Sequence, residues 1–416
     1  APRRSGGMAA IAVATDCSGM EAPIQALQNL GIPYRHVFSC DVDRHARATI
    51  EANFPPEVMY EDVRARNNAE ALASDIYFAG FPCQPFSTGG LKEGFKDRHN
   101  RGEIFFFVRD YIAQQRPKAF VLENVSGLKT TNKGEYFRAI LRSLEDLGDY
   151  NLYFELLDTV DHGVPCNRKR CYIVGIHTEA DLGSFAFPGR IPCPSIDDFL
   201  DPPPAPEAVA DALPPPSQTT ACRNVAIALT KIAKAGGNPL LNSWVVDCDA
   251  STERLQWKRG VSPCMTCSRK RGHWVTNRGR RINKPEMFRL HGMNPANFKV
   301  VVSEPQLGMQ LGNAMSVNVL ERLLVRLLPA AGLVDVELPD RWQDGSAVAA
   351  LMATRGLCFP DIPAAGARRL ADSEDGDESD DWVPTKRRRR SSDVAPTRAR
   401  RLRASVVSAA SRGTVA

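Results

Sequence analysis

Between residue 8 and about residue 177, short β-rich runs alternate with stretches that have the composition of helices. The β-rich runs cover residues 8–15, 34–41, 75–79, 118–123, 152–158 and 171–177. The intervals between them, such as 21–30 and 44–53, are predicted to be helices. This alternation is typical of right-handed βαβ units, which build a mostly parallel sheet covered by helices. We therefore predict a doubly wound α/β fold, in which ligands bind beyond the carboxyl ends of the strands.

The alternation stops near Pro188, and two proline triplets follow at 202–204 and 214–216. Proline runs cannot continue a helix or an inner strand, so we predict that a smaller, less regular domain begins here. Helix-like patterning returns at 284–291 and 317–328, and these segments are expected to fold back onto the first domain. The predicted units are a main α/β domain at 1–185 completed by 282–335, an inserted domain at 186–281, and a tail at 336–416.

The tail has the composition of a low-complexity, largely disordered segment. Residues 372–381 are mostly acidic, and a basic run starts with Lys386 and continues to Arg390. Blocks of this kind bury too little apolar surface to fold, so we expect disorder beyond about residue 336.

The distribution of charge and cysteine narrows the class of protein. The net charge is only +5, but basic residues gather at 254–281 and 386–403, which favours a polyanionic partner. No apolar run approaches the ~18 residues that cross a bilayer, and the first residues do not resemble a signal peptide. The 11 cysteines, scattered along the chain, fit a reducing compartment better than a disulfide framework. We expect no membrane association, and at least one thiol is free to be reactive.

One cysteine lies where an α/β enzyme places its chemistry. The strand predicted at 75–79 leads into Phe81-Pro82-Cys83-Gln84, and the strand at 118–123 ends in Glu123. After the strand at 152–158 come Arg168 and Arg170, which point the same way in an extended segment. Taken singly, these are a structural cysteine, a solvated carboxylate and surface charges. Together they are predicted to face one substrate at the carboxyl edge of the sheet.

This ordered set of motifs resembles the cytosine-C5 DNA methyltransferase family, over most of residues 9–177 and 281–328, or about half of the chain. The matching motifs are Pro82-Cys83-Gln84, Glu123-Asn124-Val125, Arg168-Lys169-Arg170, the group Arg281, Glu286, Arg289, Leu290 and Gly292, and Gln310-Leu311-Gly312-Asn313-Ala314. The resemblance implies a Rossmann-like methyltransferase fold with an inserted target-recognition domain. It also implies that S-adenosylmethionine is the methyl donor and that S-adenosylhomocysteine is the product.

The chemistry that the resemblance implies explains these residue types. Cytosine C5 is too weak a nucleophile to attack a sulfonium methyl group, so the Cys83 thiolate first adds to C6 while Glu123 binds or protonates N3. Arg168 and Arg170 would hold O2 of the base and favour the thiolate. Because a duplex hides C6, the cytosine must be flipped out of the stack.

The resemblance also assigns a site for the methyl donor. The turn after the first strand, Cys17-Ser18-Gly19-Met20, is the predicted adenosine-binding turn, and Asp41 is placed to accept hydrogen bonds from ribose hydroxyls. The sequence departs from the family at Cys17 and Glu21, where the family has an aromatic residue and a glycine, and at Val42, where it often has an aromatic residue. The full predicted set is Cys17, Ser18, Gly19, Met20, Asp41, Val42, Asp62, Pro82, Ile104 and Asn313.

The basic stretch at 254–281 is interleaved with tryptophan and is predicted to bind DNA, although an ordinary exposed basic face would look similar. The predicted nucleic-acid contacts are Gln84, Ser87, Arg254, Lys258, Arg259, Arg269, Lys270, Arg271 and Arg278. Cys264 and Cys267 have the spacing of zinc ligands, but a second tight pair is missing, so no metal is predicted.

The sequence also suggests two rival functions. Cys264-Met265-Thr266 is similar to a motif of the transfer-RNA methylating branch of the same family, which changes only the polymer. The altered turn at Cys17 and Glu21 suggests instead a weakly active DNA-binding regulator with the same fold. The basic run from Lys386 to Arg390 fits nuclear import, which predicts a nuclear protein that binds an import receptor and methylates DNA as an epigenetic mark; a run that simply binds DNA is the alternative. The sequence predicts neither the target sequence nor the oligomeric state.

Overall fold

The computed structural model describes residues 9–82, 103–359 and 362. Its centre is a seven-stranded sheet in the order β3-β2-β1-β4-β5-β7-β6, in which β7 runs antiparallel to both β5 and β6 and the other pairs are parallel. The strands are β1 (Ile11–Asp16), β2 (Tyr34–Cys40), β3 (Val58–Tyr60), β4 (Ile76–Ala79), β5 (Ala119–Val125), β6 (Tyr150–Asp158) and β7 (Lys169–His177). The predicted mostly parallel sheet is therefore confirmed, and only the short β3 was not predicted.

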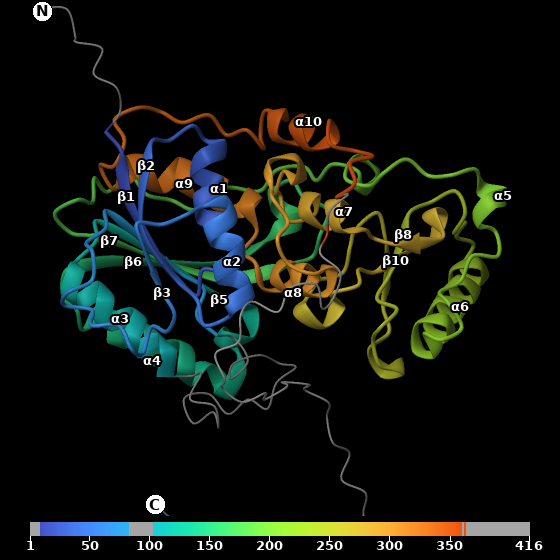
Figure 1. Ribbon diagram of the computed structural model, residues 1–416, viewed down its shortest axis with the longest axis horizontal. Helices are drawn as coiled ribbons and strands as arrows, with labels where there is room; N and C mark the ends of the chain where they lie inside the picture. The colour runs from blue at the N-terminus through green and yellow to red at the C-terminus, as the bar shows by residue number, and fades with distance from the viewer. Residues whose placement is uncertain (1–8, 83–102, 360–361, 363–416) are drawn as a thin grey trace, which may run out of the picture. The chain divides into compact units, whose positions relative to one another are not determined.

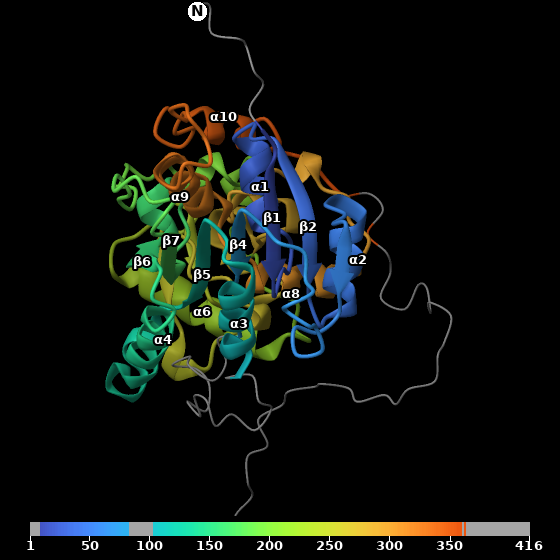
Figure 2. The same cartoon turned by 90° about the vertical axis from the view of Figure 1, so that its left-hand side faces the viewer.

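Helices cover both faces of this sheet (Figures 1 and 2). They are α1 (Ala22–Asn29), α2 (Arg44–Asn53), α3 (Ile104–Gln115), α4 (Glu135–Glu145) and α9 (Val317–Ala330). Successive residues of each inner strand enter different cores: in β5, Val121 packs with α1 and α9, whereas Phe120 and Leu122 pack with α3 and α4. Because both faces are buried, the inner strands are apolar throughout, as in doubly wound folds.

A second, four-stranded antiparallel sheet, which we call the small sheet, lies away from the large one (Figure 1). Its strands are β8 (Trp244–Val246), β9 (Trp257–Arg259), β10 (Trp274–Val275) and β11 (Arg280–Arg281), and the short α5 (Pro206–Val209) and the longer α6 (Thr219–Lys234) precede it. Helix α6 buries Val225 and Ile232 against Val246 and Trp274. The small sheet thus has its own apolar cluster, and the boundaries 186–281 stay a prediction.

The chain returns to the large sheet through α7 (Lys284–Arg289), α8 (Glu304–Asn313) and α9, so the helices predicted at 284–291 and 317–328 are confirmed. Helix α8 was not predicted, because Gly308 and Gly312 weaken its helical pattern. Both glycines allow a close approach: a Cβ on Gly308 would lie 2.1 Å from the Lys270 carbonyl oxygen, and one on Gly312 would lie 2.2 Å from the Cys267 nitrogen. They bring the segment around residues 267–270 directly onto α8.

The prediction of disorder from about residue 336 is wrong for residues 336–359. Helix α10 (Ser346–Met352) forms here, and Trp342 is only 4% exposed. The indole nitrogen of Trp342 donates to Glu321 of α9 at 3.1 Å. The segment folds because its few apolar side chains reach a core formed by residues distant in sequence. The acidic and basic blocks of the predicted tail lie outside the described residues.

Candidate functional site

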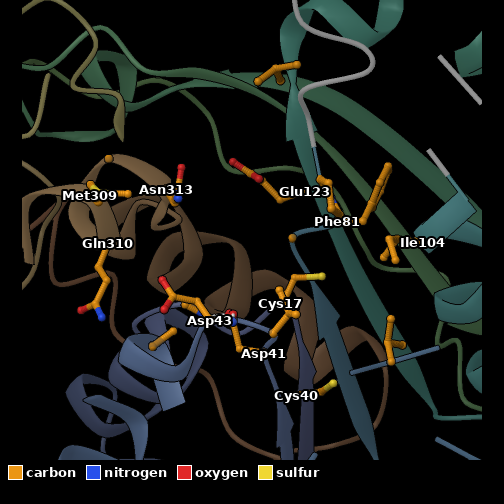
Figure 3. Close-up of a pocket in the computed structure, with 18 of the residues that line it drawn as sticks. Cys17, Cys40, Asp41, Asp43, Phe81, Ile104, Glu123, Met309, Gln310 and Asn313 are labelled. Atoms are coloured by element: carbon orange, nitrogen blue, oxygen red, sulfur yellow. Dashed lines mark hydrogen bonds between the residues drawn. The ribbon is translucent and has the colours of Figure 1, made fainter. Parts of the chain in front are cut away.

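A cavity of about 390 Å³ lies at the carboxyl ends of β1, β2, β4 and β5, where ligand binding was predicted. Such a volume suits a small-molecule ligand. Figure 3 shows Asp41 and Asp43 below Glu123, while Asn313 and Met309 approach from α8. The cavity therefore joins the ends of strands with a helix that follows the small sheet in sequence.

The turn between β1 and α1 has an unusual backbone. Cys17, Gly19 and Glu21 have positive φ angles of 51°, 58° and 54°, a conformation that costs a residue with a Cβ about 1 kcal/mol or more. The buried Glu21 side chain holds the turn in place, because its carboxylate accepts hydrogen bonds from Thr15 and Ser39 on the two neighbouring strands. This network explains how the turn keeps its shape although Glu21 stands where the family has a glycine.

Asp41, which follows β2, binds this turn directly. Its carboxylate accepts the backbone N–H groups of Gly19 and Asp43, both at 2.9 Å. Burial raises the pKa of Asp41 to about 6, although these two N–H groups oppose the shift. Each carboxylate oxygen has a further lone pair, so Asp41 can still accept hydrogen bonds from hydroxyl groups of a ligand.

The structure brings together all ten residues predicted to bind the methyl donor. The main cavity is lined by Cys17, Gly19, Asp41, Val42, Asp62, Pro82, Ile104 and Asn313. Ser18 and Met20 line an adjoining space of about 30 Å³, which shares Cys17, Gly19 and Asn313 with the main cavity. Val42 is 72% exposed, so it covers little of a ligand. The assignment of these residues to the methyl donor stays a prediction.

Glu123 and Arg170 also line the cavity. The two side chains form an ion pair, with Arg170 Nε 3.1 Å from Glu123 Oε1, and both are mostly buried. The pairing of β5 with antiparallel β7 makes this contact, since Val125 lies opposite Arg170. The carboxylate and guanidinium that the sequence predicted at one edge of the sheet are thus in direct contact.

Arg168 also lines the cavity, but most of its guanidinium faces backbone carbonyl groups. It donates to the carbonyl oxygens of Met265 at 3.2 Å, Gly312 at 3.1 Å and Ala314 at 2.5 Å. Its side chain therefore joins the start of β7 to α8 and to the segment before the small sheet's β10. Cys264 lies beside both arginines, with Sγ 4.0 Å from Arg168 Nη1 and 3.9 Å from Arg170 Nη2.

The seven basic residues predicted between 254 and 278 to contact nucleic acid are not equally available. Arg254, Arg259, Lys270 and Arg271 are exposed. Lys258 donates to Asn167, Arg269 pairs with Asp247, and Arg278 is buried and pairs with Asp197. A structural role fits the position of Arg278 better than the predicted contact with nucleic acid, because its guanidinium is only 1% exposed.

Three predicted site residues, Cys83, Gln84 and Ser87, lie outside the described residues, although Pro82, which precedes Cys83, lines the cavity. The sequence reasoning missed several residues that line the cavity. They are Cys40, Asp43, Ala46, Val63, Arg64, Gly80, Phe81, Val125, Met309, Gln310 and Gly312. Most of them are neighbours in sequence of a predicted strand end or motif, and that closeness in sequence could have identified them.

Two other expectations concern ligands and membranes. Within residues 9–82 and 103–359, no three or more histidine, cysteine or acidic side chains gather in an arrangement that could hold a metal ion. In the same part of the chain, no helix is both long enough and apolar enough to cross a bilayer.

The architecture has a counterpart among solved structures. The methyltransferase EhMeth of Entamoeba histolytica superposes with a TM-score of 0.54 and 19% sequence identity, covering 77% of this chain and 98% of that one. At such low identity the likeness concerns the fold alone. It defines the class: an α/β protein of the Rossmann-like methyltransferase fold.

The family follows from sequence comparison. The family model for C-5 cytosine-specific DNA methylase matches residues 15–328. Type II methyltransferase M.NgoBI of Neisseria gonorrhoeae is 33% identical over 287 residues, which are 69% of this chain and 84% of the relative. Type II methyltransferase M.NlaX of Neisseria lactamica is 33% identical over 303 residues, 72% of this chain and 90% of the relative. The chain therefore belongs to the C-5 cytosine-specific DNA methylase family and is a DNA cytosine-5-methyltransferase.

Proposed function

We propose that this enzyme transfers a methyl group from S-adenosylmethionine to C5 of a flipped cytosine in DNA, through a covalent bond between Cys83 and C6. One observation carries the proposal: a single cavity joins the predicted donor-binding residues to the Glu123–Arg170 pair. Methyl transfer requires both sites to open on the same space, because donor and base must meet.

The residues around the cavity fit S-adenosylmethionine, which supplies an electrophilic methyl group when bound. Asp41 has free lone pairs for ribose hydroxyls, and the turn at Gly19 exposes backbone to a ligand without a Cβ in the way. Gln310 lines the cavity, and its buried Nε2 has no hydrogen-bond partner in the described part of the chain. A polar ligand would satisfy such a group.

The proposed chemistry divides between the base and the thiol. The Cys83 thiolate forms a bond to C6 while protonated Glu123 donates to N3, which moves electron density to C5. C5 then takes the methyl group and S-adenosylhomocysteine leaves. Water or hydroxide removes the C5 proton, and the electrons of that bond expel the thiolate from C6. Arg170 holds the Glu123 carboxyl group in place, because Arg170 Nε lies 3.1 Å from Glu123 Oε1, and Arg168 and Arg170 are proposed to hold O2 of the base.

The small sheet is proposed to grip the DNA. The exposed cations Arg259 in β9 and Arg254, Lys270 and Arg271 in the connections between the strands are available to neutralise phosphates. The segment around Lys270 also packs on α8, whose last residue Asn313 lines the cavity. DNA bound there would lie next to the site of chemistry, as base flipping requires.

Localisation in the nucleus stays a proposal that rests on Lys386–Arg390, which lie outside the described residues. The two relatives named above are bacterial, so relatedness does not add support for a nuclear role. A fusion of residues 383–403 to a fluorescent protein in a eukaryotic cell tests the proposal directly, since a diffuse signal would contradict it.

The covalent step is tested by trapping. Duplex DNA with 5-fluorocytosine and S-adenosylmethionine should give a denaturation-resistant adduct, because fluorine at C5 blocks the final elimination. The variant Cys83→Ser should give none, whereas the exposed Cys193→Ser should form it normally. Absence of an adduct with the unmodified enzyme would overturn the covalent mechanism.

The choice of DNA over transfer RNA, and the sequence context of the target cytosine, are tested with natural substrates. Methyl transfer to duplex DNA and to transfer RNA, measured side by side, should favour DNA. Sequencing of the methylated cytosines should show a defined context. Preferential methylation of transfer RNA would support the rival substrate, and methylation without context would contradict recognition by the small sheet.

A further inference from the structure

Arg64 occupies a defined place in the cavity. It follows β3, at the same edge of the sheet as Asp41, and it lines the cavity together with Asp62 and Val63. The Arg64 guanidinium forms a fork with the Asp62 carboxylate: Nε lies 3.0 Å from both oxygens, and Nη2 lies 2.6 Å from Oδ2. The Arg64 backbone N–H also donates to Asp62 at 2.9 Å. The guanidinium is therefore held by one carboxylate, which the Arg64 backbone N–H holds in turn.

The fork leaves the faces of the guanidinium free to contact a ligand. Hydrogen bonds to Asp62 lie in the plane of the group, and the Arg64 side chain is 46% exposed. The neighbouring carboxylate keeps the pKa of Arg64 above its ordinary value, and the same contact lowers the pKa of Asp62. Both groups thus stay charged, and the pair persists over the physiological pH range.

This end of the cavity contains little else that could cover a flat ring. Among the described residues that line the cavity, Phe81 is the only aromatic one, and it is 2% exposed and packs against Phe105. Val42, on the other side of Asp41, is 72% exposed. Among the described residues, a planar heterocycle near Asp62 would therefore find one accessible flat, polarisable surface, that of Arg64.

We propose that Arg64 binds the adenine ring of the methyl donor by stacking its guanidinium plane on the ring. The inference rests on the proposed function, because it assumes that the cavity holds a nucleoside. Arginine stacks on π systems more readily than lysine, since its charge is delocalised over a plane and less strongly hydrated. The fork with Asp62 prepares the plane before the ligand arrives, which reduces the conformational entropy lost on binding.

Calorimetric titration of S-adenosylhomocysteine into the full chain tests the inference. The variant Arg64→Ala should bind about tenfold more weakly. The variant Arg64→Lys, which keeps the charge but not the plane, should lose nearly as much. An aromatic plane introduced nearby, as in the double variant Val42→Trp with Arg64→Ala, should recover part of the affinity. The control Arg35→Ala, which removes a surface ion pair with Glu57, should bind like the unmodified enzyme.

A second ligand locates the effect at the nucleoside. With 5′-methylthioadenosine, which lacks the amino-acid end, Arg64→Ala should weaken binding by the same factor. The inference is overturned if Arg64→Lys binds like the unmodified enzyme, if the loss disappears with this smaller ligand, or if Arg64→Ala has no effect. Failure of the unmodified enzyme to bind S-adenosylhomocysteine at all would instead overturn the proposed function.

Discussion

The cavity at the large sheet and the basic face of the small sheet use charged residues in opposite ways. Around the cavity, charged groups such as Asp41, Glu123 and Arg170 come from different strands and meet at one edge. Around the small sheet, cations that are close in sequence differ in exposure: Arg271 is exposed, whereas Arg278 is buried. Order along the chain therefore predicts which charged residues share a site in the first region, but not which cations are exposed in the second.

The difference has a structural cause. Parallel strands bring every carboxyl end to the same edge, so a motif after any inner strand reaches a common site. The small sheet is antiparallel and its strands have only two or three residues. The exposure of each cation there therefore depends on its own local contacts.

Removing the acid of Glu123 should nearly abolish activity without unfolding the enzyme. The variant Glu123→Gln should transfer methyl groups about 10²–10⁴-fold more slowly, which is the usual contribution of a general acid. Single-turnover methyl transfer to duplex DNA measures the effect, and circular dichroism checks the fold. Glu135→Gln, at an exposed position on α4, is the matched control and should keep full activity. Equal rates for the two variants would break the assignment of the cavity's chemistry.

Arg278 should matter for stability rather than for DNA. Its Nη1 lies 2.6 Å from both Asp197 and Ser243, so Arg278→Met should lower the free energy of unfolding by about 2–3 kcal/mol. Urea denaturation measures this change, with the exposed Arg254→Met as control. Weaker DNA binding with unchanged stability would show that Arg278 contacts nucleic acid after all.

The four exposed cations of the small sheet should govern DNA affinity. Their joint replacement by alanine should weaken binding by about 10³-fold near 0.1 M salt and reduce the slope of log K against log salt concentration by about 3–4. The replaced residues are Arg254, Arg259, Lys270 and Arg271. A matched set of exposed cations elsewhere, Arg35, Lys118, Arg190 and Arg326, should leave both quantities nearly unchanged. Equal losses for the two sets would mean that DNA binding depends on net charge alone.

Acid should destabilise the region of the large sheet through a buried histidine. Burial, together with Arg322 beside the ring, lowers the pKa of His162 to about 4. The unfolded chain therefore takes up a proton first, near pH 6.5, and stability is lost as the pH falls from 6.5 toward 4. This contribution is on the order of 1 kcal/mol per pH unit. His162→Asn should flatten the pH dependence of urea unfolding, while the half-exposed His45→Asn should not.

Several parts of the molecule followed from the sequence. The alternation of strands and helices predicted the large sheet. The motifs predicted a common site for Asp41, Asp62, Glu123 and Arg170, and these four residues line one cavity. Helix α8 and the folded segment at 336–359 were not predicted. Their stability depends on contacts with residues far away in sequence, as Trp342 shows by binding Glu321.

The sequence by itself determined the family, the fold class and the residues around the cavity, because those depend on the order of motifs at the ends of parallel strands and at the start of antiparallel β7, which meet at one edge. Tertiary structure decided how each charged side chain is used. Only long-range packing gives Arg168 three carbonyl partners, buries Arg278 and leaves Arg271 exposed. A guanidinium looks the same in every sequence, and its role depends on the groups that surround it after folding.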